Sequence, residues 1–188
     1  PHWGQALRLS LFQVVSIITT TGFCTADYLQ WPPLPHALLL VLMGVGGCAG
    51  STGGGIKVMR VLILLKHAKR ELKKMRHPRG VFTLWFNNRA ISGNLQTNVL
   101  GFFLLYMMVY VSGVLILTLG GRDLLTSVGA TAATLGNIGP GLGLVGPASN
   151  YSVLLDWEKW LLVIFMVIGR LELFTVLVLF LPGAWRKS

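Results

Sequence analysis

The sequence predicts an all-α membrane protein built from repeats of an outer helix, a re-entrant pore helix, a filter loop and an inner helix around a pore. Hydrophobic residues make up 53% of the 188 residues and charged residues 12%, whereas soluble domains carry about 25% charged residues. The mean hydropathy is +0.67. Short stretches rich in glycine and hydroxyl groups separate the apolar segments, and a helix that crosses a bilayer would not contain them.

The first predicted element is a short helix from Gln5 to Thr19 that ends in a run of threonines. Ser16–Phe23 reads SIITTTGF, and hydroxyls followed by Thr-Gly-aromatic are typical of a potassium filter, whose backbone carbonyls replace the ion's water. Glycine permits the backbone angles that aim successive carbonyls at one line. We therefore predict filter backbone at Thr20, Thr21 and Gly22, with potassium held at Thr20 and Thr21. In a soluble protein the same residues would more often form a turn.

The second element, from Pro35 to about Leu65, is predicted to cross the membrane with a break near its middle. Gly44–Gly55 reads GVGGCAGSTGGG and holds too many glycines for a regular helix. A phosphate-binding loop is excluded because Ile56 separates Gly55 from the next lysine. A dinucleotide-binding loop is not expected, because the segment lies in a predicted span with no strand before it.

A basic segment follows this span. Ten of the 16 Lys and Arg residues lie from Lys57 to Arg89, with Glu71 as the only acid, so the positive-inside rule places the segment in the cytoplasm. Its stretch from Lys66 to Lys74 is either an amphipathic helix at the membrane surface, a docking site for a cytoplasmic partner, or a solvated face that only fixes topology. Nucleic-acid binding is not expected, because neither aromatic-basic interleaving nor zinc-ligand spacing accompanies the charge.

Two further spans are predicted at about Leu95–Leu119 and Leu154–Leu181, each longer than the ~20 residues that cross a bilayer. Between them, Arg122–Thr134 is too short and too rich in hydroxyls to cross. Gly136–Gly141, sequence GNIGPG, follows it directly. We therefore expect a half-helix that enters the membrane and turns back.

The turn after this half-helix is the second predicted filter loop, at Asn137, Ile138 and Gly139, with potassium held at Asn137 and Ile138. Re-entrant backbone is tolerated only when packed in protein or lining a water-filled cavity, because an unsatisfied peptide group in hydrocarbon costs several kcal/mol. Two such loops indicate a pore.

The same order of elements thus occurs twice, and the domain organisation follows from it. Residues 1–66 form a pore helix, filter loop and broken inner helix, residues 67–94 a basic cytoplasmic linker, and residues 95–188 a complete repeat. The first copy lacks its leading span, and the chain opens in mid-pattern at Pro1. We therefore expect it to be a fragment.

Four motifs together resemble the Trk/Ktr/HKT superfamily of potassium transporters, and most of all its bacterial Trk-type membrane subunit. They are Thr19–Phe23, Gly46–Lys57, Gly136–Gly141 and Gly169–Glu172, and the resemblance covers nearly the whole chain. It implies four repeats around one pore, with this chain as the end of repeat three plus repeat four. The missing N-terminal repeats, the lipid bilayer and a location as a multi-pass protein of the bacterial inner membrane are implied with it.

The resemblance also implies partners and a cargo. Relatives of this kind work as dimers of pores on a cytoplasmic ring of nucleotide-binding regulatory subunits, which would be the natural partner of the basic segment. Potassium is the implied transported ion, and no bound cofactor is expected.

A gate is predicted beneath the filter. Gly53 lies 31 residues after Gly22, and Arg170 lies 31 residues after Gly139, so the repeats place the glycine break and the arginine at equivalent depth. A charge within an apolar span is by default functional. The resemblance implies that Gly53–Gly55 and Arg170 obstruct the pore. The alternative is that Arg170 only holds the bundle together, although Glu172 would not face it on a helix.

The predicted function is potassium uptake through a carbonyl-lined filter. Catalysis is not expected, because neither a nucleophile-base-acid arrangement nor a carboxylate pair occurs. Two alternatives stay open: a secondary transporter with broken helices and alternating access, and a membrane scaffold that recruits a cytoplasmic partner.

Overall fold

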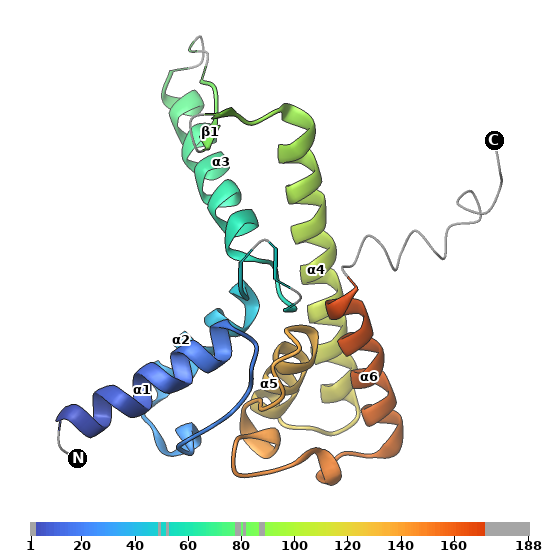
Figure 1. The fold of residues 1–188 in the computed structure, drawn as a ribbon. Helices are drawn as coiled ribbons and strands as arrows, with labels where there is room; N and C mark the ends of the chain where they lie inside the picture. Colours follow the sequence, from blue (N-terminus) through green and yellow to red (C-terminus); the bar gives the residue numbers. More distant parts are fainter. Residues whose placement is uncertain are drawn as a thin grey trace.

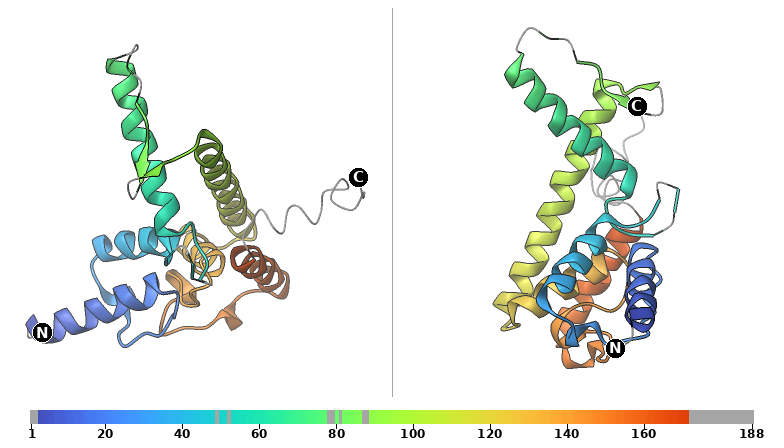
Figure 2. Two further views of the ribbon diagram at one scale, coloured as in Figure 1. Left: turned by 45° about the horizontal axis from the view of Figure 1, so that its top comes forward. Right: turned by 90° about the vertical axis from the view of Figure 1, so that its left-hand side faces the viewer.

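The computed structural model describes residues 3–48, 50–51, 53–77, 80, 82–86 and 89–171. Within these residues the chain is helical apart from one pair of two-residue strands (Figure 1). Two of the helices, α3 and α4, extend together beyond the others on one side of the molecule (Figure 2). An all-α membrane fold is the architecture that the apolar composition predicted.

The first two helices, α1 (Trp3–Ile18) and α2 (Pro33–Val45), pack side by side. The loop between them contains a short 3-10 turn at Tyr28–Gln30. Helix α2 begins at Pro33, two residues before the predicted start, because proline has no N–H to lose in the first turn and its fixed φ suits a helix.

The expected break in the second element lies between α2 and α3 (Val58–Arg76). Ile56 N–H donates to the Gly44 carbonyl at 3.0 Å and Lys57 N–H to the Val45 carbonyl at 2.8 Å. Each bond reaches twelve residues back, where a continuous helix reaches four. The glycine-rich loop therefore interrupts the helix, and these two hydrogen bonds hold the end of α2 and the start of α3 together.

Helix α3 carries the basic segment. It runs without interruption past residue 67, where the sequence placed the start of a linker, because Leu, Lys, Arg and Glu all favour a helix. Its last turn contains Lys73, Lys74 and Arg76, whose charges suit a helix C-terminus. The antiparallel strands β1 (Trp85–Phe86) and β2 (Arg89–Ala90) then lead to the next helix.

Helix α4 (Gly93–Leu119) is the predicted outer span. Its 27 residues have a hydropathy of 2.3 over the best window, and it is the one helix in the described part of the chain that is long and apolar enough to cross a membrane. It begins after Ser92, whose side chain accepts the Leu95 N–H.

Helix α5 (Leu124–Leu135) is the predicted half-helix. It has 12 residues, and Asp123 caps its start by accepting the Thr126 N–H. The chain then returns through 3-10 turns at Gly143–Val145 and Tyr151–Val153 to the end from which α5 began (Figure 1). This path is the re-entrant geometry that the sequence predicted.

Helix α6 (Asp156–Arg170) completes the described structure. It packs against α5, which also contacts α4 and α2. The predicted span was longer, and its part from residue 172 lies outside the described residues. Nearly every α5 residue is buried, so α5 is the centre around which the other helices are arranged.

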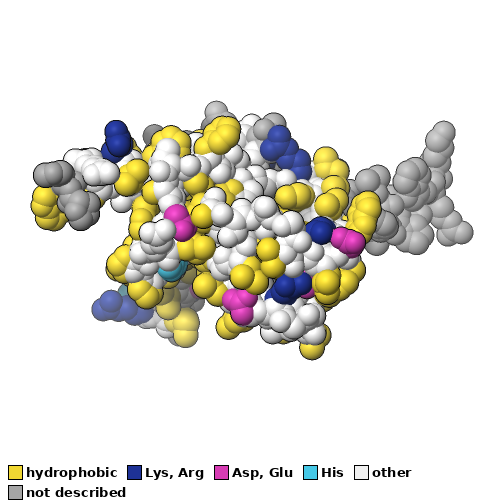
Figure 3. Space-filling model, turned by 90° about the horizontal axis from the view of Figure 1, so that it is seen from below, with side chains coloured by type: hydrophobic (Ala, Val, Ile, Leu, Met, Phe, Trp, Pro, Cys, Tyr) yellow, Lys and Arg dark blue, Asp and Glu magenta, His cyan; other side chains and the backbone are white. Residues whose placement is uncertain are grey.

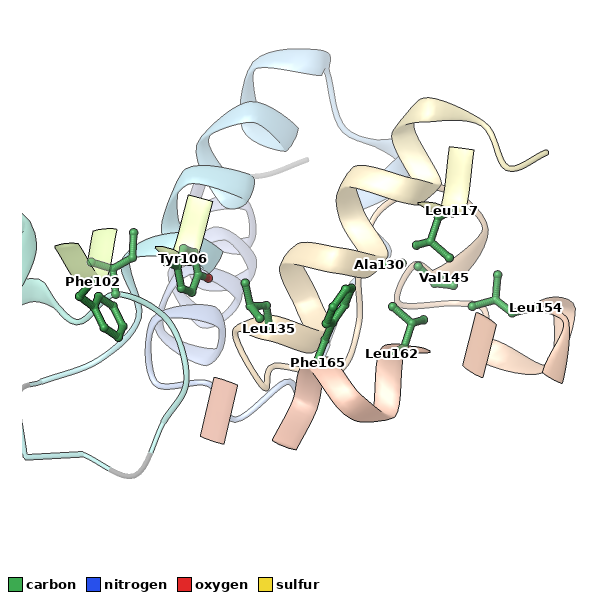
Figure 4. Close-up of a cluster of buried hydrophobic side chains, with 10 residues drawn as sticks. Phe102, Tyr106, Leu117, Ala130, Leu135, Val145, Leu154, Leu162 and Phe165 are labelled. Carbon is green, nitrogen blue, oxygen red and sulfur yellow. The ribbon is translucent and has the colours of Figure 1, made fainter. Parts of the chain in front are cut away.

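The larger hydrophobic core joins α4, α5 and α6 through Leu117, Ala130, Leu135, Leu162 and Phe165 (Figure 4). Many large apolar side chains point outward instead, including Leu104, Met108 and Leu115 on α4. Hydrophobic side chains are also spread in patches over the face seen from below, among backbone atoms, uncharged polar groups and several charged groups (Figure 3). Such a surface suits lipid or further protein as its neighbour.

Candidate functional site

The two predicted filter loops have the same backbone shape. Thr20 and Gly22 have φ angles of 55° and 78°, and Asn137 and Gly139, each 117 positions later, have 54° and 112°. A left-handed conformation is uncommon for residues with a side chain, yet both loops adopt it two residues before their glycine. The repeat inferred from the order of elements therefore extends to individual dihedral angles.

The hydrogen bonds that set this shape are also matched. In each loop the left-handed residue donates its N–H three residues back over 3.1 Å, and the next residue donates five residues back over 2.9 Å. The acceptors are the carbonyls of Ile17 and Ser16 in the first loop and of Thr134 and Ala133 in the second. The chain thus turns sharply at the end of α1 and at the end of α5. The carbonyls of the residues that follow no longer point along the helix axis.

The two loops touch. A Cβ atom on Gly22 would overlap the Ile138 carbonyl oxygen and lie 3.2 Å from Cδ of Pro140. Only glycine combines this close approach with a positive φ. Gly139 differs, because a Cβ there would meet nothing within 4 Å, so its side faces open space. The structure thus brings the six predicted filter residues together from segments over a hundred residues apart.

The predicted potassium ligands are the carbonyls of Thr20, Thr21, Asn137 and Ile138. Within the described part of the chain, none of these four oxygens accepts a hydrogen bond. The carbonyls just beyond them do: Ser16 Oγ donates to Phe23 at 2.7 Å, and Tyr151 Oη donates to Gly139 at 2.6 Å. The hydrogen bonding therefore distinguishes carbonyls available to a ligand from carbonyls held by the protein.

Two tyrosines that the sequence analysis did not select hold the second loop. Tyr28 Oη, from the turn between α1 and α2, donates to the Gly141 carbonyl at 2.7 Å, and Tyr151 binds Gly139. Burial raises the pKa of Tyr151 to about 12 and that of Tyr28 well above its usual value. Both hydroxyls therefore stay protonated at neutral pH and act as donors. Because Tyr28 and Gly141 are 113 residues apart, no local pattern could have paired them.

The left-handed residue of each loop points its side chain at a glycine of the following inner element. A Cβ on Gly53 would lie 2.7 Å from Thr20 Oγ1, and one on Gly169 would lie 2.9 Å from Asn137 Nδ2. That amide also donates to the Met166 carbonyl of α6 at 3.0 Å. The inner elements thus support both loops at equivalent places.

The predicted gate loop lies against the base of both filter loops. Gly53 is beside Thr20, and Gly54 is buried against the second loop, where an added Cβ would lie 2.5 Å from the Gly136 carbonyl oxygen. Gly55 packs against Gly46 at the end of α2. These contacts leave no room for side chains.

Arg170, the other predicted gate residue, is the last residue of α6 and is exposed. The residue before it, Gly169, packs against the Leu135 carbonyl at the end of α5. Arg170 therefore begins just below the second filter loop. Its sequence neighbour Glu172 lies outside the described residues.

A buried ion pair at the other end of these helices was also missed. Arg122 Nε lies 2.8 and 3.1 Å from the two carboxylate oxygens of Glu158, whose side chain is 0% exposed. Glu158 also accepts the Leu155 N–H at 2.7 Å, and its hydrogen bond raises the pKa of Arg122. The pair joins the turn before α5 to the start of α6. The two residues are 36 positions apart, and neither carries a motif.

Comparison with known proteins identifies relatives for nearly the whole chain. Residues 1–186 match the family described as TrkH, cation transport protein. The Trk system potassium uptake protein TrkH of Vibrio parahaemolyticus is 46% identical over 183 residues, which are 97% of this chain and 37% of that protein. TrkH of Salmonella typhimurium is 44% identical over 181 residues, 96% of this chain and 37% of the relative. TrkG of Escherichia coli is 39% identical over 178 residues, 95% of this chain and 36% of the relative.

A solved structure is similar over the same length. The crystal structure of the potassium transporter TrkH from Vibrio parahaemolyticus has a TM-score of 0.88 and 46% identity, and the match covers 97% of this chain and 38% of that chain. The chain therefore spans less than two fifths of the proteins that it resembles.

Proposed function

Because this chain belongs to the TrkH family of cation transport proteins, and is thus part of a membrane protein, we propose that it contributes half of a potassium-selective filter and the gate beneath it. Its relatives carry the name potassium uptake protein. The observation that carries the proposal is the matched pair of loops at residues 20–22 and 137–139, which touch through Gly22 and Ile138. Backbone carbonyls from both loops would replace the water of a dehydrated potassium ion.

The proposed ligands are the carbonyls of Thr20, Thr21, Asn137 and Ile138. They accept no hydrogen bond from a described residue, which is what an ion ligand requires. Gly22 and Gly139 act through their backbone angles, and the Gly139 carbonyl is occupied by the Tyr151 hydroxyl. The pore helices α1 and α5 end at the loops, and the partial negative charge of a helix C-terminus favours a cation there.

The proposed gate consists of Gly53–Gly55 and Arg170. The glycine loop touches the bases of both filter loops, so an ion leaving the filter would meet it next. Arg170 adds a positive charge that repels potassium electrostatically. Loop and arginine together form one barrier in this proposal.

The wider assembly is proposed from the family resemblance and from chain length. Residues 1–66, 67–94 and 95–188 would be the end of one repeat, a cytoplasmic linker and the next repeat of a multi-pass protein in the bacterial inner membrane. Further repeats of the same polypeptide would complete the ring, since the relatives are more than twice as long. A second copy and a cytoplasmic nucleotide-binding regulatory subunit are the proposed partners.

Alanine at Gly22 or Gly139 of the natural protein tests the filter. Both glycines need a positive φ, so alanine strains the backbone by ~1–3 kcal/mol and turns the neighbouring carbonyls. We expect the preference for rubidium over sodium to fall about tenfold or more, since 1.4 kcal/mol is a factor of ten. The effect should be larger at Gly22, where the Cβ also meets the Ile138 carbonyl.

Gly121→Ala is the matched control. Gly121 has a φ of 89° but lies in the exposed turn after α4, with nothing within 4 Å of an added Cβ. Uptake of both ions would be measured in a host that lacks potassium transport, at equal amounts of protein in the membrane. Unchanged ion preference in the Gly22 and Gly139 variants would remove these loops from the filter.

A further inference from the structure

A basic pocket lies at the far end of α3, away from the filter. Its volume is about 250 Å³, and it is enclosed by one face of α3 and the returning segment at residues 82–85. Four cationic side chains line the helix side, and their spacings of three and four residues place them on one face of α3: Lys66, Lys69, Arg70 and Lys73. Lys66 Nζ also donates to the Trp85 carbonyl at 2.9 Å, which fixes the segment against the helix.

The positive charge of this pocket exceeds its negative charge. Glu71 is the only acid between residues 57 and 89, and it is shared by Arg70 at 2.8 Å and Lys74 at 3.3 Å. Lys69 and Lys73 make no ion pair with a described residue and are exposed. An anion that entered would therefore meet the ammonium groups of Lys69 and Lys73, which no carboxylate of a described residue neutralises.

The pocket also lies where an apolar surface gives way to a charged one. The first half of α3 exposes Leu62 and Leu65 at 41% and 57%, and its basic residues follow directly from Lys66. Trp85, which is 59% exposed, stands on the opposite wall. Tryptophan and lysine beside exposed leucines are the composition of a membrane-water boundary.

We propose that this pocket binds the phosphate of an anionic phospholipid from the cytoplasmic leaflet. Lysine ammonium groups bind phosphate as point charges, and Lys69 and Lys73 are placed to do so without breaking an existing pair. The leucines and Trp85 would contact the acyl chains, which a soluble phosphate does not have. The inference rests on the cytoplasmic orientation proposed above, but not on ion transport.

The test is lipid-dependent stabilisation of the purified natural protein in detergent. Thermal unfolding would be followed after adding phosphatidylglycerol, phosphatidylcholine or inorganic phosphate. Each lysine strengthens binding to an anionic surface about fivefold, so the double variant Lys69→Gln/Lys73→Gln should need about 25-fold more phosphatidylglycerol for the same shift in Tm. Lys74→Gln is the matched control, because it removes one charge from the same helix but does not line the pocket.

The expected result is a shift in Tm with phosphatidylglycerol alone, kept by Lys74→Gln and displaced to about 25-fold higher lipid concentration in the double variant. An equal shift with inorganic phosphate would identify a soluble-anion site and overturn the lipid assignment. A double variant that responds like the wild type would place the lipid elsewhere. A double variant that keeps the lipid shift but no longer co-purifies with a cytoplasmic subunit would reassign the pocket to protein docking.

Discussion

Tyr28 and Tyr151 hold the second predicted filter loop through hydrogen bonds from their hydroxyl groups rather than through charges. They bind the carbonyls of Gly141 and Gly139, so these oxygens cannot turn without breaking a hydrogen bond. A potassium filter selects by the number and placement of its carbonyls, and in the proposed filter the two tyrosines would exclude these two oxygens. We therefore expect the tyrosines to influence selectivity without touching the ion.

Phenylalanine at Tyr151 of the natural protein should lower the preference for potassium over sodium while the protein still folds. The substitution removes a hydrogen bond of about 1 kcal/mol and leaves the ring in place, which frees the Gly139 carbonyl. Relative uptake of rubidium and sodium checks it. Tyr110→Phe is the matched control, because its hydroxyl reaches the Val128 carbonyl only at 3.5 Å. Equal ion preference in the two variants would contradict a role for the Tyr151 hydroxyl.

Alanine at Glu158 should destabilise the protein by more than the loss of an exposed ion pair does, because it removes the buried carboxylate that accepts from both Arg122 Nε and the Leu155 N–H. The matched control is Asp156→Ala, two residues earlier, which breaks an ion pair whose carboxylate is 92% exposed and costs about 0–1 kcal/mol. Thermal unfolding of the detergent-solubilised protein compares them. Similar melting temperatures for the two variants would mean that the Arg122–Glu158 pair does not contribute to stability.

The sequence could select the predicted filter residues but not the groups that hold their loops. Thr20–Gly22 and Asn137–Gly139 stand out because hydroxyls, glycines and apolar segments occur in a recognisable local order. Tyr28 and Glu158 act across 113 and 36 residues, and nothing beside them in the chain marks them as partners of these groups. The left-handed φ of Thr20 was also not predictable, because a β-branched residue adopts it only where the surrounding contacts impose it.

Among the elements, the broken span formed by α2 and α3 has the most unusual pattern of backbone hydrogen bonds. The helical bonding passes from α2 to α3 across an insertion of eight residues, 48–55, through the bonds from Ile56 to Gly44 and from Lys57 to Val45. In the proposed gate, the loop would leave its place without separating the two helices, because these bonds hold them together. Such a gate would need no rocking of the bundle, which would favour a channel-like mechanism over alternating access.

Deleting residues 48–55 should join α2 and α3 into one continuous helix and raise potassium flux, since Ile56 would then bond four residues back. Deleting only residues 49–55 shifts the register by one and should reduce the amount of folded protein. Tracer flux at matched membrane levels, with ion preference measured in parallel, compares the two deletions. Wild-type flux after the eight-residue deletion would exclude the loop as a barrier.

The helices were predicted correctly where the length of an apolar segment determines whether the segment can cross a membrane. α4 lies where a largely apolar stretch of 25 residues predicted a span, and α5 is as short as its hydroxyl content implied. The basic part of α3 was harder, because a charged amphipathic sequence is compatible with a helix or with a linker. Its helix is stabilised by good local propensity and by packing against α4, which the sequence does not reveal.

At the scale of the whole molecule, the two predicted filter loops touch each other, and a Cβ on Gly139 would face open space. In the proposed four-repeat arrangement, further loops would lie on that open side and close the ion path. The chain covers 37% or 38% of the length of the TrkH proteins of Salmonella typhimurium and Vibrio parahaemolyticus. The remaining length of such a protein is sufficient for the other proposed repeats.

Residues 1–188 expressed alone should therefore give no selective potassium uptake. Half of the ion's ligands would be missing, and backbone groups of the loops would face lipid, where each unsatisfied group costs several kcal/mol. Rubidium uptake in a transport-deficient host checks this, with the natural protein at the same membrane level as the control. Robust uptake by residues 1–188 would contradict the four-repeat proposal, or would mean that two copies complete one ring.

The two filter loops also differ in when they can form during synthesis. The first is fastened by its own pore helix, since Ser16 binds Phe23 and Gln13 binds Ala26, over 7 and 13 residues. The second needs Tyr28, made long before it, and the Met166 carbonyl, made 29 residues after Asn137. Contacts close in sequence form early, and distant ones wait for their partners. During synthesis, the first loop could thus form these hydrogen bonds as soon as its own segment has been made. The second loop would lack its hydrogen bonds until α6 has been made and the turn that contains Tyr28 has packed against it.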